Sequence, residues 1–225
     1  MSEPLFPETP DVPDIPEHPR ASDPLAAPVT PDGADVAAIL AVLIDRSGSM
    51  EHLRGAVVEG VNVLLGDLDP ADRVTIVQFD SEDPYDVVVD GIPAAEVAPI
   101  TADQYQPRGG TPLFDAVGTA IARVTGKVRE AEVLTGVTPK IVLAILTDGY
   151  ENSSREYSGT QVRRLIEQCQ ADGWTVTYVG IGLGEQAFTE AAALGVDARA
   201  TLSVTADRSG TMRAMRSVSD FRRRT

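Results

Sequence analysis

Three short segments of the chain carry oxygen-bearing side chains at spacings that could hold a metal ion. Asp45, Ser47 and Ser49 alternate in the segment Asp-Arg-Ser-Gly-Ser, which places them on one side of a turning loop. Thr111 follows two glycines, and Asp148 stands in the segment Thr-Asp-Gly. Two carboxylates and three hydroxyls are hard donors, which favour Mg²⁺, Mn²⁺ or Ca²⁺ over zinc or copper. With only two formal negative charges, such a site leaves a position open for a carboxylate from outside.

These segments must be brought together by a sheet of mostly parallel strands. Continuously apolar stretches are typical of strands buried on both faces, and apolar residues every three or four positions are typical of helices. Strands are predicted at 36–44, 73–79, 85–90, 141–146, 174–181 and 200–204, and helices at 51–65, from 111–112 onward, and at 160–171, 185–194 and 211–222. The strand at 85–90 is expected to be an antiparallel edge strand. In such α/β sheets, ligands bind beyond the carboxyl ends of the strands, where Asp45 and Asp148 stand.

The segment 45–49, Thr111 in Gly-Gly-Thr-Pro and Asp148 in Thr-Asp-Gly together resemble the metal-ion-dependent adhesion site of von Willebrand factor A (VWA) domains. The resemblance extends over residues 36–222, and all five positions of the site are filled. It implies a doubly wound, Rossmann-like, mostly parallel sheet of about six strands, with one antiparallel edge strand and helices on both faces. We therefore interpret residues 36–225 as a VWA domain.

The resemblance also implies a role for each of the five residues. Ser47 and Ser49 would ligate the metal directly, and Thr111 would do so directly or through water, depending on the conformation. Asp45 and Asp148 would supply the carboxylates. In the alternative interpretation, Asp45 and Ser49 only cap the following helix and Asp148 only belongs to a turn.

Five further residues close to these segments could form a rim that contacts a partner: Arg46, His52, Tyr150, Glu151 and Asn152. Arg46 is the strongest candidate because it stands between two predicted ligands, which should point it outward beside the metal. There it could pair with an acidic partner. Each of the five could instead be an ordinary solvated loop residue.

Charge and cysteine content exclude several classes of function. The net charge is −15 and the pI is near 4.4, so a nucleic acid or an anionic membrane surface would repel the chain. Cys169 is the single cysteine, which rules out an internal disulfide, and residues 1–30 lack the basic and apolar segments of an export signal. We therefore expect a cytoplasmic protein that binds neither nucleic acid nor membranes.

Residues 1–35 differ in composition from the rest of the chain. They hold nine of the 16 prolines, and eight acidic residues against one arginine. From Pro4 to Pro19 a proline recurs at every third position, which is the period of polyproline II. We interpret this segment as an acidic, proline-rich tail, disordered or in polyproline II. It could dock a second protein, place a carboxylate on the metal site, or act only as an acidic leader.

These features predict a protein-interaction module rather than an enzyme. A divalent cation, expected to be Mg²⁺ with Ca²⁺ or Mn²⁺ as alternatives, would accept Glu or Asp of a partner protein as its last ligand. The resemblance to stand-alone, cytosolic bacterial-type members implies partners such as AAA+ ATPases or stress-related kinase and phosphatase systems. The resemblance to integrin-type domains implies that the Thr111 loop is coupled to the terminal helix.

Three other functions stay open at this point. A metal-dependent phosphohydrolase would use Asp45 as its nucleophile, but it would need a second acid where Ser47 stands and a lysine nearby, and neither is present in these segments. A scaffold protein would act through the proline-rich tail alone. A purely structural domain would bind no metal.

Overall fold

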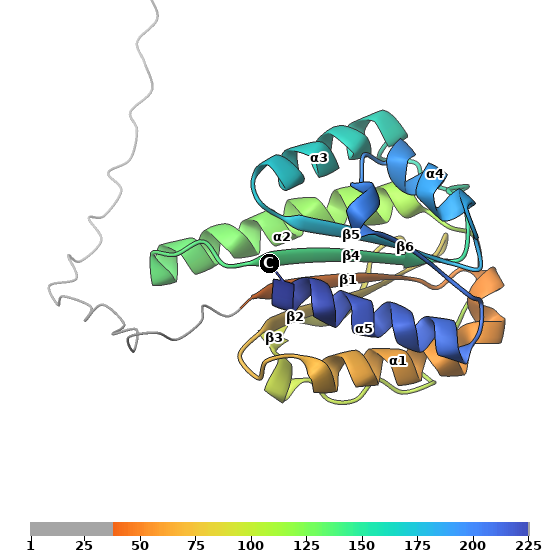
Figure 1. The fold of residues 1–225 in the computed structure, drawn as a ribbon, viewed down its shortest axis with the longest axis horizontal. Coiled ribbons are helices and arrows are strands. Elements are labelled where there is room, and N and C mark those ends of the chain that lie inside the picture. The colour runs from red at the N-terminus through yellow and green to blue at the C-terminus, as the bar shows by residue number, and fades with distance from the viewer. Residues whose placement is uncertain (1–37, 225) are drawn as a thin grey trace, which may run out of the picture. The chain divides into compact units, whose positions relative to one another are not determined.

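The computed structural model describes residues 38–224 of the chain, and the predicted tail over 1–35 lies outside them. Within the described residues, six strands form one sheet in the order β3-β2-β1-β4-β5-β6 (Figure 1). The strands are β1 (Ile39–Asp45), β2 (Arg73–Phe79), β3 (Asp86–Pro93), β4 (Ile141–Thr147), β5 (Thr175–Ile181) and β6 (Thr201–Val204). Only the pairing of β2 with β3 is antiparallel. The predicted sheet, with its antiparallel edge strand, is therefore confirmed.

Helices cover both faces of the sheet (Figure 1). α1 (Arg54–Asp67) and α5 (Arg208–Arg224) pack against each other on one face, and the other face carries α2 (Leu113–Thr135), α3 (Gly159–Ala171) and α4 (Gln186–Ala193). Every residue of β1 is buried, because neighbouring side chains such as Leu43 and Ile44 enter the cores on opposite faces. Between residues 38 and 224, no helix is both long and apolar enough to cross a bilayer.

The register of the central strands aligns their carboxyl ends at one edge of the sheet. Asp45 at the end of β1 pairs with Phe79 at the end of β2, and Ile44 pairs with Leu146 near the end of β4. The loops that follow these three strands must therefore meet above the same edge. This register is what makes a shared site possible for residues more than a hundred positions apart in the chain.

Two helix starts differ from the prediction. The helix expected over 51–65 is divided into a 3₁₀ segment, η1 (Gly48–Leu53), and α1, because the chain has to turn back sharply after β1. Pro112 occupies the N-cap position before α2 rather than a place in the first helical turn. Proline offers no side-chain acceptor for the free N–H groups of that turn, so α2 has no cap of its own.

Candidate functional site

Five predicted oxygen donors meet at the carboxyl edge of the sheet: Asp45, Ser47, Ser49, Thr111 and Asp148. Ser49 Oγ donates a hydrogen bond to Asp148 Oδ1 at 2.7 Å, and the hydroxyl oxygens of Ser47 and Ser49 lie 3.1 Å apart. A β-carbon placed on Gly149 would lie 3.3 Å from Thr111 Oγ1 and 3.9 Å from both Asp45 Oδ2 and Ser49 Oγ. Donors from three separate loops therefore surround one small space beside Gly149.

Hydrogen bonds hold three of these oxygens at separations similar to those between neighbouring ligands of a small, hard dication. At Mg²⁺–oxygen distances of roughly 2.0–2.1 Å, two ligands at adjacent corners of an octahedron lie about 2.9 Å apart. The Ser49–Asp148 and Ser47–Ser49 hydrogen bonds, at 2.7 and 3.1 Å, fall on either side of this value. Within residues 38–224, no group of three or more His, Cys, Asp or Glu side chains is arranged to hold a metal ion. A site at this edge therefore depends on its hydroxyl donors.

Three of the five donor residues are buried, and the other two are accessible to solvent. Asp45, Ser47 and Thr111 are at most 2% exposed, whereas Ser49 is exposed and Asp148 is partly exposed. A ligand can therefore reach the donor cluster from the side of Ser49 and Asp148.

Asp45 is held rigidly from several directions. Its Oδ2 accepts a hydrogen bond from Thr147 Oγ1 at 2.5 Å, and its Oδ1 accepts one from the backbone N–H of Ser47 at 2.7 Å. The hydroxyl of Tyr105 donates to the backbone carbonyl of Asp45 at 2.6 Å. Burial raises the pKa of the Asp45 carboxyl to about 6, although the hydrogen bonds from Thr147 and Ser47 lower it. A cation beside this carboxyl would favour its ionised form.

Arg46 does not point outward, so its predicted role in the rim is wrong. Its side chain is 7% exposed and forms ion pairs with Asp80 and Asp86, each at 2.6 Å. It also donates to Gln78 Oε1 at 3.0 Å. Alternate side chains along this segment face opposite sides, and Arg46 therefore points away from the donors of Asp45 and Ser47, towards the end of β2. The guanidinium neutralises a buried acid there instead of facing a partner.

The other four rim candidates divide into two groups. His52 is exposed, with its Nδ1 2.8 Å from the carbonyl of Ser49, and Tyr150 is exposed and hydrogen-bonded to Gln186 of α4. The side-chain oxygens of Glu151 and Asn152 instead accept hydrogen bonds from backbone N–H groups at the start of α2. His52 and Tyr150 thus stay candidates for partner contact, whereas Glu151 and Asn152 have contacts inside the protein.

Comparison with known families identifies the domain. The model of the von Willebrand factor type A domain family matches residues 40–220. The chain belongs to this family. This match, together with the six-stranded sheet, confirms the predicted family and fold. Comparison with curated protein sequences gives no significant match.

Solved structures with the VWA fold resemble this chain at low sequence identity. Proximal thread matrix protein 1 from the mussel byssus superposes with a TM-score of 0.61 at 18% identity, covering 83% of this chain and 47% of that protein. A von Willebrand factor type A protein from Catenulispora acidiphila has the same TM-score and identity, with coverage of 81% and 42%. The manganese-loaded TRAP protein of Plasmodium vivax reaches 0.55 at 17% identity, covering 81% and 73%. The chain spans less than half the length of the first two proteins.

Several residues that shape the candidate site were not found from the sequence. Asp80 is fully buried and binds both Arg46 and Arg108, and Tyr105 supports Asp45 from a loop without regular structure. Neither residue has a sequence signal, because each is identified only by a partner far away in the chain. Thr147 did have a signal, since it directly precedes Asp148 in the Thr-Asp-Gly segment.

Asp80 should make the stability of the VWA domain sensitive to acid. Burial would raise the pKa of the Asp80 carboxyl, but the N–H groups of Asp83 and Glu82 and the guanidinium groups of Arg108 and Arg46 outweigh it and lower the pKa. The ionised form therefore stabilises the fold above the unfolded pKa of about 4, and this contribution is lost as the pH falls through the lower folded pKa. In urea unfolding, the stability difference between wild type and Asp80→Asn should shrink as the pH falls from 7 to 3. A constant difference would contradict this assignment.

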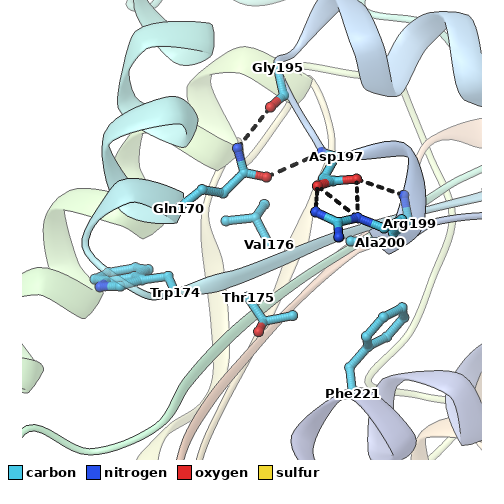
Figure 2. A pocket seen from close by; sticks show the side chains of 9 residues that line it. All are labelled: Gln170, Trp174, Thr175, Val176, Gly195, Asp197, Arg199, Ala200 and Phe221. Carbon is cyan, nitrogen blue, oxygen red and sulfur yellow. Dashed lines mark hydrogen bonds and ion pairs between the residues drawn. The ribbon is translucent and has the colours of Figure 1, made fainter. Parts of the chain in front are cut away.

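One groove of the described domain lies away from the oxygen cluster. It has a volume of about 640 Å³, and its lining comes from α3, β5, the segment 195–200 and α5 (Figure 2). Trp174 and Thr175 stand at the amino end of β5, and Ala200 directly precedes β6. The groove is therefore at the opposite edge of the sheet from the donors, and it takes no part in the candidate site.

Proposed function

We propose that this VWA domain binds a divalent cation through Asp45, Ser47, Ser49, Thr111 and Asp148, and uses it to hold a carboxylate of a partner protein. The observation that carries the proposal is the convergence of donors from three loops around the space beside Gly149. The space is open on the side of Ser49 and Asp148. When bound, the cation would supply the positive charge that attracts a carboxylate.

A chain with this net charge can attract an acidic partner only if a cation is bound. With a net charge of −15, the chain would repel an acidic partner. Arg46 cannot offset this repulsion, because its charge is used by Asp80 and Asp86. Attraction of a Glu or Asp side chain would therefore rest on the metal.

We propose Mg²⁺ as the physiological ion, because hydroxyl and carboxylate oxygens are hard ligands and a set of five leaves one octahedral position open. Mn²⁺ accepts similar ligands and can serve as the experimental probe. Two proteins of similar fold are described as a manganese-loaded TRAP protein and a pilus adhesin, which supports metal binding and adhesion as functions of this fold. The cytoplasmic location and the AAA+ ATPase or stress-kinase partners stay predictions.

We also propose that the domain is not a phosphohydrolase. The chain has two lysines, Lys127 and Lys140. Lys127 pairs with Asp90, and Lys140 directly precedes the amino end of β4, at the edge of the sheet away from the donors. A phosphoryl group on Asp45 would therefore lack the lysine that commonly balances its charge.

The proposal is tested by affinity capture from the native host. Wild-type protein and Asp148→Ala are used as baits, each with Mg²⁺ and with a chelator. A partner protein retained only by wild type and only with Mg²⁺ is the expected result. Identical sets of retained proteins under all four conditions would overturn the proposed metal-dependent interaction.

Gly149→Ala should block the metal site while leaving the fold intact. The added methyl group would enter the space between Thr111, Asp45 and Ser49, but at 3.3–3.9 Å it meets no backbone atom closely. Metal affinity is expected to fall roughly tenfold, or about 1.4 kcal/mol. Calorimetric titration with Mn²⁺ measures the affinity, and thermal unfolding without metal provides the control for the fold. Unchanged affinity would place the metal elsewhere.

A further inference from the structure

The amino end of α2 is capped by side chains from another part of the chain. Pro112 supplies no cap, so the first N–H groups of the helix need acceptors from elsewhere. The N–H of Phe114 donates to Glu151 Oε2 at 2.9 Å, and the N–H of Asp115 donates to Ser154 Oγ at 3.1 Å. Both acceptors belong to the loop between β4 and α3. The negative charge of Glu151 also suits the positive end of the helix dipole.

The same loop is held in return by α2. The carboxylate of Asp115, which is buried, accepts hydrogen bonds from the N–H groups of Arg155, Glu156 and Tyr157 at 2.7, 2.9 and 2.8 Å. Glu151 further accepts from the N–H groups within its own loop. The start of α2 and the β4–α3 loop therefore form an interlock in which each segment satisfies the backbone of the other.

Asn152 extends this interlock to the predicted ligand Thr111. The backbone N–H of Thr111 donates to Asn152 Oδ1 at 2.9 Å, and the backbone N–H of Asn152 donates to the carbonyl of Thr111 at 3.1 Å. Asn152 stands four residues after Asp148 on the same loop. Asn152 thus links the backbone of Thr111 to the loop that carries Asp148.

We propose that Asn152 is a positioning residue of the metal site. Its side chain binds the backbone N–H of Thr111 and not a predicted metal-ligating oxygen. It acts by holding this backbone so that the Thr111 hydroxyl faces the space beside Gly149. The interlock with Asp115 and Glu151 keeps Asn152 itself in place. This inference rests on the proposed function, because it concerns affinity for the same cation.

The first test compares Asn152→Ala with a matched control. Asn62 makes a similar clamp remote from the donors, since it accepts from the N–H of Ile100 at 2.7 Å and donates to the carbonyl of Ile100 at 2.9 Å. Loss of an outer partner of a ligand typically weakens metal binding about tenfold to a hundredfold. We expect this loss of Mn²⁺ affinity for Asn152→Ala and none for Asn62→Ala. Asn152→Asp, which keeps the acceptor oxygen, should recover most of the affinity.

A double-mutant cycle decides whether Asn152 acts through Thr111. In a Thr111→Ala background, adding Asn152→Ala should cause no further loss of Mn²⁺ affinity, because the hydroxyl to be positioned is already gone. Independent, additive losses would overturn the inference. If wild type itself does not bind Mn²⁺, the proposed function fails.

A metal-free measurement tests the contact itself. Hydrogen exchange of the Thr111 amide should be faster in Asn152→Ala than in wild type, because its acceptor has been removed. Equal exchange rates would show that Asn152 does not hold this segment, whatever the metal does.

Discussion

Asp148→Ala should abolish the stabilisation of the domain by Mg²⁺ while leaving the metal-free protein folded. A ligand that binds only the folded state stabilises it by about 2.7 kcal/mol at one hundred times its Kd, and a domain of this size gains roughly 2–4 °C in Tm per kcal/mol. Wild type is thus expected to gain several degrees on adding Mg²⁺. The variant should gain none, because Asp148 supplies one of only two carboxylates in the donor set. Calorimetric thermal scans with and without Mg²⁺ measure the effect.

The control for this experiment removes a carboxylate of similar exposure at another place. Asp220 is half exposed near the end of α5, where it pairs with Arg223. Asp220→Ala changes the net charge as Asp148→Ala does, and it should keep the full stabilisation by Mg²⁺. If both variants lost the stabilisation, the effect would come from the overall charge, and the assigned site would be wrong.

Arg46→Met should destabilise the fold strongly. Removing one member of a buried ion pair leaves an uncompensated charge, and the expected loss in the free energy of unfolding is about 3 kcal/mol. Asp80 is 0% exposed, and after the substitution it would keep Arg108 but lose the Arg46 guanidinium, which binds it through two nitrogens. Urea unfolding at neutral pH measures the loss.

A surface ion pair provides the comparison for Arg46. Arg199 pairs with Asp197, and its side chain is 91% exposed. Arg199→Met should have only a small effect, because water already solvates both charges. Similar losses for the two arginines would show that the burial of Arg46 has no special consequence. If Arg46 faced a partner, as its sequence position suggested, its replacement would change binding and not stability.

Arg46 illustrates which parts of the candidate site could be predicted from the sequence. The candidate donor residues were predicted from their types, their spacing and their resemblance to VWA domains, because they stand at the ends of apolar strands or just before a helix. The direction of Arg46 was predicted wrongly, because it depends on Asp80, which is 34 residues away in the chain. Glu151 and Asn152 were assigned to the rim for the same reason, since their partners at the start of α2 are about 40 residues away.

The sequence by itself determined the order of strands and helices, because the apolar stretches and their periods are local properties of the chain. It also determined which oxygen donors are available and that they stand at strand ends or just before a helix. Only the tertiary structure decided which polar side chains face the open space and which support it from below. The direction of these side chains depends on which buried charges and backbone N–H groups they pair with in other loops. A buried polar group without a partner lowers the stability of the fold, however far away in the sequence its partner stands.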